Sequence, residues 1–338
     1  MSLATPRVAV VGAGLAGEAC ARALASGGVE VEVHDRGRVP GGRMASPRVA
    51  ERRVDVGASY FTVRDEGFSA VVDDWRGRGL ARPWTDAFHL AGPDGLGELK
   101  PGPVRWAARD GLRSLVADLL TGLDVRQSAA VRAVGPGPTV DGRAYDAVVL
   151  ALPDPQAAPL LDPALEAERA AVADRVWEPV LALAAGWDER HWPQDFDGCF
   201  VEGSDVLGWV ADDGRRRGDG APVLVAHSTS PWAADRLVEP EAATADVVDA
   251  LRAVLRIDPE PAWTKVQRWT YARPAAPRDQ PFHLGPARVG LCGDGWGSPR
   301  VETAWTSGDA LGRALLAELS SPAVTAGPVD GAPGRACC

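Results

Sequence analysis

The sequence has little of what marks a nucleic-acid-binding or membrane-spanning protein. Its formal net charge is −10, and this acidic balance disfavours binding to nucleic acid or to an anionic membrane. No apolar run approaches the ~20 residues that a helix needs to cross a bilayer. The first residues, MSLATPR, lead directly into an apolar segment, so we expect no signal peptide.

Cysteine is also scarce, and its placement excludes a metal site and a disulfide framework. The chain has five cysteines, Cys20, Cys199, Cys292, Cys337 and Cys338. They are odd in number and scattered, without CxxC or metal-ligand spacing, which fits a reducing cytoplasm. We therefore predict a cytoplasmic protein without bound metal. Its 338 residues, 46% of them hydrophobic, are enough for about two domains.

The strongest motif lies near the N-terminus, in VAVVGAGLAGEACARALASGGVEVEVHDR. The apolar run 8–11 is typical of a buried parallel strand. Gly12, Gly14 and Gly17 follow with GxGxxG spacing and open an Ala-rich helix. In such a motif the first glycine permits a tight turn, the second lets a pyrophosphate approach the backbone, and the third permits close helix packing. The helix N-terminus favours the diphosphate electrostatically.

A second strand ends at Asp35, whose carboxylate is placed to accept hydrogen bonds from an adenosine ribose. A Gly-rich turn in another kind of α/β protein is the alternative. The strand–turn–helix–strand–acid order within about thirty residues is the context that the motif requires. The sequence therefore predicts a dinucleotide site here.

Two further segments follow, Gly41-Gly42-Arg43-Met44 and the stretch from Val54 to Arg64, VDVGASYFTVR. A two-glycine loop followed by Arg suits a cofactor whose second half lies deep in the protein. Arg43 can donate two hydrogen bonds to the pyrophosphate, although it can also be a surface cation.

The remainder of the chain shows helical and strand periodicities. We predict helices over 65–79, 111–120, 161–173 and 239–255. We predict strands over 123–126, 129–134, 145–152, 180–185, 223–228 and 263–271, with hairpins over 80–105. The segment 212–220 is charged and Gly-rich, and we interpret it as a solvated loop. A strand over 289–292, then Gly293-Asp294 and a helix through 319, closes the fold, and 321–338 has the composition of a disordered tail.

The ordered set GxGxxG, GGRM and DVGASYFTVRD resembles the flavoprotein amine oxidase superfamily and, within it, the bacterial members of the renalase family. AHSTSPW (226–232) and KVQRWTYARP (265–274) are similar to renalase signatures, so the resemblance covers residues 8 to about 319. It implies an α/β protein: a Rossmann-type FAD-binding domain with a second α+β substrate domain on an antiparallel sheet, as in p-hydroxybenzoate hydroxylase and the amine oxidases. The FAD-binding domain is then discontinuous (1–64, 106–154 and 282–320), and 65–105 with 155–281 forms the substrate domain.

The resemblance also assigns residues to the cofactor, which is FAD bound non-covalently. The expected cofactor-binding residues are Gly12, Gly14, Gly17, Asp35, Arg36, Gly42, Arg43, Met44, Gly57, Ala58, Ser59, Tyr60, Gly293, Asp294, Val301, Glu302 and Thr303. The helix after Asp294 is expected to point its N-terminus at the flavin, where a partial positive charge stabilises the reduced ring. Asp294 read alone can also be a turn residue.

The substrate face, by the same resemblance, comprises His227, Arg64, Trp232, Tyr271 and Trp296. His227 can instead be a hydrogen-bonded core histidine. Arg64 can instead be an ion-pair partner of Asp65 or Glu66.

Renalase-like enzymes oxidise the 2- and 6-dihydro isomers of NAD(P)H to NAD(P)+ by hydride transfer to flavin N5, and O2 is reduced to H2O2. This chemistry needs no general base, and the sequence shows no acid/base dyad. The expected partners are a dihydronicotinamide dinucleotide or another small substrate and O2, in a monomer or homodimer. Two alternatives stay open: an FAD-dependent amine oxidase or dehydrogenase acting on a secondary metabolite, and a non-enzymatic flavin-binding protein.

Overall fold

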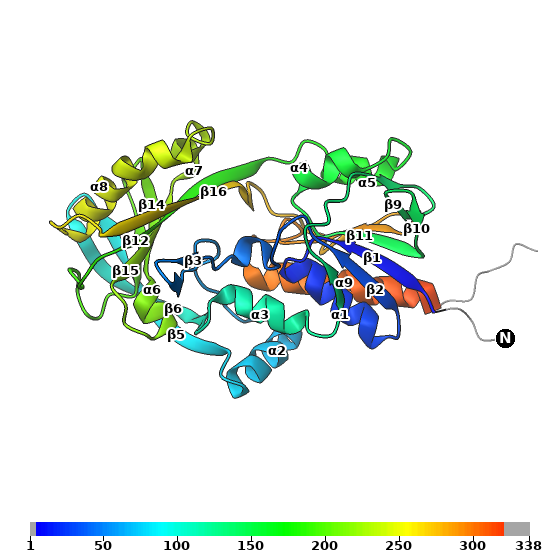
Figure 1. Ribbon diagram of the computed structural model, residues 1–338, viewed down its shortest axis with the longest axis horizontal. Helices are drawn as coiled ribbons and strands as arrows, with labels where there is room; N and C mark the ends of the chain where they lie inside the picture. Colours follow the sequence, from blue (N-terminus) through cyan, green and yellow to red (C-terminus); the bar gives the residue numbers. More distant parts are fainter. Residues whose placement is uncertain (1–4, 321–338) are drawn as a thin grey trace, which may run out of the picture.

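The computed structural model describes residues 5–320, and it has two lobes, each built on one large β-sheet (Figure 1). A six-stranded sheet has the strand order β17-β18-β11-β1-β2-β7, and a seven-stranded sheet has the order β16-β12-β15-β14-β13-β5-β6. The predicted fold class is confirmed: a Rossmann-type α/β lobe is joined to an α+β lobe on a mainly antiparallel sheet. The expected tail lies outside the described residues.

The six-stranded sheet is parallel except at one edge. It consists of β1 (Arg7–Val11), β2 (Glu30–His34), β7 (Asp124–Arg126), β11 (Ala147–Leu150), β18 (Val289–Leu291) and the antiparallel edge strand β17 (His283–Leu284). The central strand β11 and residues 8–11 of β1 are apolar and buried, as expected of parallel strands that are covered on both faces of the sheet.

One face of this sheet packs against α1 (Leu15–Ser26), α3 (Leu112–Leu119) and α9 (Val301–Ser320). Helix α9 approaches α1 closely because Gly308 and Gly312 have no side chain, and a Cβ on Gly308 would collide with the Ala16 carbonyl. The other face carries α4 (Asp154–Ala157), η2 (Ala158–Leu160), α5 (Glu166–Val172) and a small sheet of β8 (Val134–Gly135), β9 (Thr139–Val140) and β10 (Arg143–Ala144).

The seven-stranded sheet combines segments that are far apart in the sequence. It consists of β5 (Ala81–Gly92), β6 (Gly95–Ala108), β12 (Trp177–Gly186), β13 (Gly198–Val201), β14 (Leu207–Asp212), β15 (Val223–Ser228) and β16 (Trp263–Pro274). All neighbours are antiparallel except β5 and β13, which pair in parallel. Helix α2 (Glu66–Gly77) precedes β5 and packs below the first lobe.

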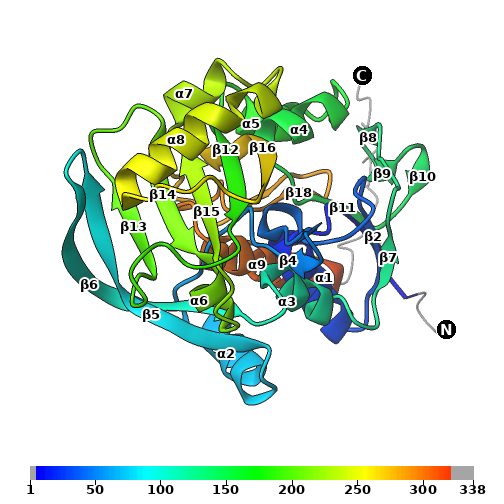
Figure 2. The same cartoon turned by 60° about the vertical axis from the view of Figure 1, so that its left-hand side comes forward.

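The two faces of this sheet have different neighbours (Figure 2). Helices α7 (Ser230–Ala234) and α8 (Thr244–Leu255), with η3 (Pro240–Ala243), cover one face and pack on Leu181 and Leu183. The alternate residues Ala182 and Ala184 point to the opposite face and pack on Val54 and Val56 of the first lobe. We call this second face, which is turned toward the first lobe, the inner face.

Most sequence-based element predictions are confirmed, including the helix over 65–79, the hairpins over 80–105 and the strand over 263–271. Three are wrong in extent or kind. The predicted strand 129–134 shrinks to β8 because the Asp141 carboxylate binds the backbone N–H groups of Arg132 and Ala133. The predicted helix 161–173 begins at Glu166, after a turn closed by Leu165 on Asp162. The segment 212–220, predicted as a solvated loop, contains the helix α6 (Asp213–Arg217).

Within residues 5–320, none of the helices combines the length and apolarity needed to cross a bilayer.

Candidate functional site

The turn between β1 and α1 forms an open cradle. Gly12 has a φ of +110°, and its N–H donates to the His34 carbonyl at 2.8 Å, which holds β2 against the turn. Gly14 is the N-cap of α1 without any side-chain cap, and a Cβ placed on it would meet no atom within 4 Å. Gly17 faces the turn so closely that a Cβ would collide with the Gly12 carbonyl. The free N–H groups of α1 therefore face open space, which fits a diphosphate.

Asp35 stands at the rim of this cradle, directly after β2. Its carboxylate accepts hydrogen bonds from the backbone N–H of Ala13 (2.7 Å) and Gly37 (2.6 Å). Each carboxylate oxygen has a further lone pair, so Asp35 can also accept a ribose hydroxyl. Arg36 is exposed.

The Gly41–Gly42 loop lies on the same turn. Gly41 has a φ of +118° and donates to the Ala13 carbonyl at 2.8 Å, and a Cβ on Gly42 would lie 3.4 Å from the Gly14 Cα. The short helix η1 (Gly42–Met44) follows and buries Met44 in the core.

Arg43 and Asp294, distant in sequence, form a two-point ion pair. The two Arg43 terminal nitrogens donate to the Asp294 carboxylate at 2.7 and 2.6 Å, and the guanidinium lies 5.0 Å from the Trp177 ring centroid. Arg43 was expected to pair with the pyrophosphate. The structure brings both expected cofactor residues together at the carboxyl ends of the parallel strands, where α/β sheets bind nucleotides.

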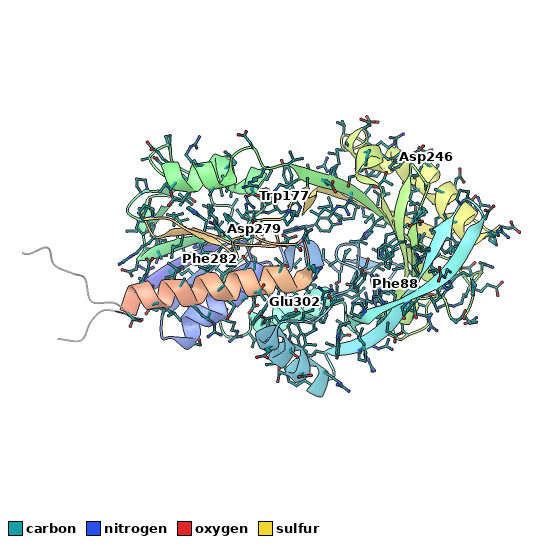
Figure 3. All side chains as sticks on the ribbon, turned by 180° about the vertical axis from the view of Figure 1, so that it is seen from behind. Phe88, Trp177, Asp246, Asp279, Phe282 and Glu302 are labelled. Atoms are coloured by element: carbon teal, nitrogen blue, oxygen red, sulfur yellow. The ribbon has the colours of Figure 1, made fainter. Side chains whose placement is uncertain are left out.

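The N-terminus of α9 completes this side of the site. The Glu302 carboxylate accepts hydrogen bonds from the backbone N–H of Arg64 (2.5 Å) and Asp65 (2.8 Å). Glu302 lies at the end of α9 that faces the seven-stranded sheet (Figure 3). The Gly293 N–H donates to Ser307 at 3.0 Å. These bonds orient the positive end of α9 toward the space between the lobes.

The segment 54–60 is held by donors from the other lobe. Gly57 has no room for a Cβ beside the Arg43 carbonyl, which accepts the Ala58 N–H at 2.9 Å. The indole N–H of Trp269 donates to the Val56 carbonyl at 2.7 Å, and that of Trp209 donates to Ser59 Oγ at 2.9 Å.

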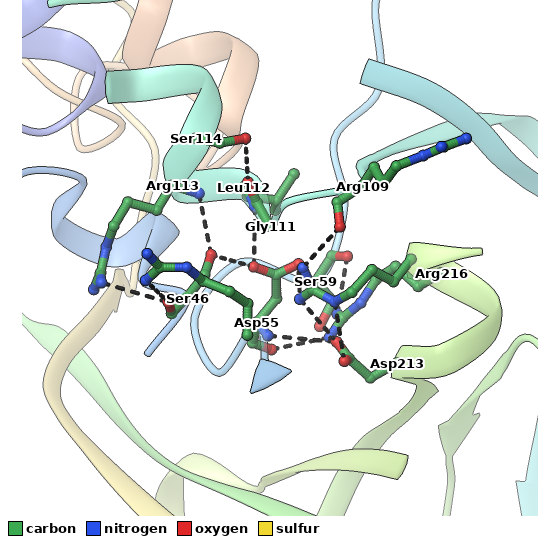
Figure 4. Close-up of polar contacts among 12 residues, drawn as sticks. Ser46, Asp55, Ser59, Arg109, Gly111, Leu112, Arg113, Ser114, Asp213 and Arg216 are labelled. Carbon is green, nitrogen blue, oxygen red and sulfur yellow. Dashed lines mark hydrogen bonds and ion pairs between the residues drawn. The ribbon is translucent and has the colours of Figure 1, made fainter. Parts of the chain in front are cut away.

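The charged segment 212–220 supplies the strongest of these anchors, so its interpretation as a solvated loop is wrong. Residues Asp213–Arg217 form α6, and Arg216 is fully buried. Arg216 donates to the carbonyls of Ser59 and Asp55, each at 3.0 Å, and to the Asp213 carboxylate at 2.5 Å (Figure 4). The charges of this segment are paired at i, i+3 and i, i+4 spacing, which a composition-based interpretation cannot distinguish from a solvated face.

This cluster is built around two buried carboxylates, those of Asp55 and Asp213. Burial alone would raise the pKa of Asp213, but the charges of Arg216, Arg217 and Arg52 outweigh it and hold that pKa at about 2. Asp55 binds Arg217 at 3.2 Å and accepts the backbone N–H of Leu112 at 3.0 Å. The cluster thus fastens the segment 54–60, and with it Ser59 and Tyr60, to both lobes.

His227 lies on the inner face of the seven-stranded sheet. It pairs in register with Ala182 on one side and with Trp209 on the other, so these side chains share one face. Burial, and then the positive charge of Arg216, lowers the pKa of His227 to about 4. Its Nε2 is buried without a partner among the described residues. At neutral pH His227 is therefore an uncharged group with hydrogen-bonding capacity to spare.

An aromatic cluster lies beside His227 on this face. It consists of Tyr60, Trp84, Phe88, Phe200 and Trp209. The ring centroids of Phe88 and Trp209 are 4.7 Å apart in an edge-to-face arrangement, and Figure 3 labels Phe88 on β5. Sequence reasoning singled out Tyr60 alone. Strand alternation puts Trp209 on one face with Ala211, but only the pairing of β14 with β15 brings it to His227.

The other expected substrate residues are spread out. Arg64 is exposed and forms no ion pair with a described residue, and Tyr271 is half-buried on β16. Trp232 packs with the residues under α8, on the face opposite to His227, and Arg236 lies 4.2 Å from its ring centroid. Trp296 is buried in the core under α4 and α5, with Arg278 4.1 Å from its ring centroid. The structure does not bring these two tryptophans to the His227 face.

The residues present fit FAD. The open cradle at Gly14, the acceptor Asp35 and the Arg43–Asp294 pair suit its diphosphate and sugar portions, and the α9 N-terminus suits a ring that gains negative charge. Val301 and Thr303 lie in the first turn of that helix, and Thr303 Oγ1 donates to the Ser298 carbonyl at 2.6 Å. Within residues 5–320, no group of His, Cys, Asp and Glu side chains is arranged to hold a metal ion.

Comparisons with known proteins agree with this geometry. A sequence model described as NAD(P)-binding Rossmann-like domain matches residues 10–75, and one described as flavin containing amine oxidoreductase matches residues 77–311. A hydroxyneurosporene desaturase from Rubrivivax gelatinosus is 44% identical over 71 residues. That match spans 20% of this chain and only 14% of the desaturase.

Several solved structures share the fold at low sequence identity. A protein from Exiguobacterium sp. 255-15 assigned as a protoporphyrinogen oxidase gives a TM-score of 0.76 at 13% identity, covering 94% of this chain and 100% of its own. A wild-type putrescine oxidase bound to putrescine gives 0.68 at 16% identity, covering 93% and 99%. An oxidoreductase from Methanosarcina mazei gives 0.68 at 14% identity, covering 92% and 100%.

Proposed function

The chain belongs to the family of flavin-containing amine oxidoreductases and is an FAD-dependent oxidoreductase, and from this premise we propose that it acts as a renalase-like oxidase. Its substrates are then the isomeric dihydronicotinamides, 2- or 6-dihydro-NAD(P), which it converts to NAD(P)+. The substrate ring loses a hydride, and O2 takes up the two electrons with two protons, one of them from solvent, to give H2O2. A bound FAD supplies the two-electron acceptor for this exchange.

The observation that carries the proposal is the absence of an available base among the described residues of the site. Asp294 is paired with Arg43, Asp55 with Arg217, and the Glu302 carboxylate is occupied by two backbone N–H groups. His227 is neutral, but its low pKa makes it a weak base. Loss of a hydride to form an aromatic pyridinium requires no proton removal. This reaction can therefore proceed in a site whose described residues offer no available base.

The residues of the inner face would orient the substrate. The aromatic cluster around Tyr60 offers faces on which a flat ring can stack. The unpartnered Nε2 of His227 can hydrogen-bond a carboxamide. Fixing the ring by stacking and one polar contact supplies the alignment on which the rate of a transfer reaction depends.

A second candidate function is oxidation of an amine. The same aromatic cluster can attract an alkylammonium through cation–π contacts, and the fold is shared with a putrescine oxidase. A protonated amine would, however, find no unpaired carboxylate among the residues described above.

Anaerobic mixing of the FAD-loaded protein with each dihydronicotinamide isomer, followed at the flavin absorbance near ~450 nm, tests the proposal. We expect rapid loss of absorbance with the 2- or 6-isomers and a slow response to ordinary 4-dihydro-NAD(P)H. Readmitted O2 should restore the colour with one H2O2 per turnover. If putrescine or benzylamine bleaches the flavin and no isomer does, the function is amine oxidation.

A further inference from the structure

A buried arginine on the inner face has no acidic partner. The Arg105 side chain, on β6, is only 8% exposed, and its Nη1 is buried without a hydrogen-bond partner among the described residues. The other buried arginines differ: Arg216, Arg217 and Arg278 each form an ion pair with an aspartate at 2.5, 3.2 and 2.6 Å. No described carboxylate neutralises Arg105 in this way.

The position of Arg105 connects it to the aromatic cluster. Its guanidinium lies 4.4 Å from the Phe88 ring centroid and interacts with the Tyr60 hydroxyl. Burial raises the pKa of Tyr60, and the positive charges of Arg105 and Arg300 oppose that rise. Phe88 in turn contacts Trp209, which pairs with His227.

A second cation stands at the edge of the same region. Arg300 is exposed and immediately precedes α9, whose N-terminus also carries partial positive charge. Although the whole protein is acidic, the local field around Tyr60 is therefore positive. A buried cation is costly unless an anion meets it, and none of the described residues 5–320 forms an ion pair with Arg105.

We propose that Arg105 binds an anionic group of the substrate, a carboxylate or a phosphate, while the apolar part of the substrate stacks on the Tyr60–Phe88–Trp209 cluster. The planar guanidinium can donate two parallel hydrogen bonds to either oxyanion. This inference rests on the proposed function only in placing the substrate at the inner face. It makes Arg105 the residue that selects anionic substrates and rejects alkylammonium ions.

Binding of small probes to the FAD-loaded protein, measured by calorimetry without turnover, tests the proposal. Benzoate, phenyl phosphate, benzamide and benzylamine share one ring and differ in the attached group. We expect at least one of the two anions to bind about 10- to 100-fold more tightly than benzamide, as a charged hydrogen bond provides, and benzylamine to bind weakest. If benzoate binds more tightly, the anionic group of the substrate is a carboxylate. If phenyl phosphate binds more tightly, it is a phosphate.

Variants test whether Arg105 causes the preference for anions. Arg105→Gln should remove the advantage of the anion over benzamide, and Arg105→Lys should retain part of it because the charge remains. Lys100→Gln is the matched control, because Lys100 is an exposed cation on the same strand, and it should leave the preference unchanged. Circular dichroism and flavin content check that each variant is folded and loaded.

Three results would overturn the inference: equal binding of benzoate, phenyl phosphate and benzamide by the wild type, an anion preference that survives in Arg105→Gln, or loss of FAD in that variant. The first of these needs no variant at all. If no dihydronicotinamide reduces the flavin but the anion preference depends on Arg105, the proposed function fails and this inference stands.

Discussion

At the scale of single residues, the cofactor end of the site depends on side chains that are missing. At Gly17 and Gly57, a backbone carbonyl occupies the space that a Cβ would need, so any larger residue there would disturb the fold. Gly14 differs, because its φ of −86° suits any residue and open space surrounds the position of a Cβ. The packing of the described chain therefore does not require a glycine at position 14.

Gly14→Val should consequently yield a folded protein that does not retain FAD. The valine side chain would occupy the space in front of the free N–H groups of α1, where we expect the diphosphate to bind. We expect flavin content to fall more than tenfold while circular dichroism stays that of the wild type. Gly77→Val, at another glycine whose Cβ would meet nothing, should keep its flavin, and a fully loaded Gly14→Val would contradict the placement of FAD.

At the scale of elements, α6 and the segment 54–60 act as one unit. Arg216 holds two carbonyls of that segment, and Asp213 forms ion pairs with Arg216, Arg217 and Arg52. Removing one member of such a buried ion cluster leaves an unpaired charge in the interior, which costs more than the pair itself contributes.

Asp213→Asn should therefore lower the free energy of unfolding by about 3–5 kcal/mol, measured by denaturant unfolding of the FAD-loaded protein. Asp219 is the matched control, since it also binds Arg52 but its side chain is 47% exposed. Asp219→Asn should cost less than about 1 kcal/mol.

The same carboxylate gives the stability a defined pH dependence. The folded pKa of Asp213, about 2, lies below its ordinary value of 3.8. Its stabilisation is therefore complete above about pH 4 and is lost as the pH falls toward 2. The melting temperature of the wild type should drop across this interval, and that of Asp213→Asn should drop less. Parallel curves would show that other carboxylates cause the acid sensitivity.

At the scale of the whole molecule, the two lobes enclose the candidate site from opposite sides. The cradle, Arg43–Asp294, the α9 N-terminus and Tyr60 come from the six-stranded lobe. His227 and the other four aromatic residues of the cluster come from the seven-stranded lobe. The described cysteines lie in the interiors of these lobes, Cys20 and Cys292 in one and Cys199 in the other. Burial raises the pKa of Cys199 and of Cys292 to about 12, and it raises that of Cys20 as well.

We therefore predict that FAD is bound without a covalent link to these cysteines, because a thiol with a raised pKa is a poor nucleophile. Acid precipitation of the protein should release all flavin into the supernatant. Flavin retained in the precipitate, and shifted in mass with a tryptic peptide containing one of these cysteines, would contradict the prediction.

Local sequence patterns were enough to predict the structure of the nucleotide half of this protein. The β1–α1 turn, Asp35 and the Gly41–Gly42 loop lie within about thirty-five residues, and their geometry follows from glycine φ angles, helix termini and strand order. The second sheet was also predicted as strands and hairpins, because alternation of apolar and polar residues is a local signal.

The side chains that line the candidate site come together through contacts between distant parts of the chain. Arg216 reaches Ser59 across 157 positions, and Trp209 reaches Ser59 across 150, so no local pattern contains these contacts. Whether a charged residue is solvated or buried depends on which distant charge meets it, as Asp55 and Asp213 show for α6. The same holds for Arg105, whose lack of a partner becomes visible only when all its neighbours are in place.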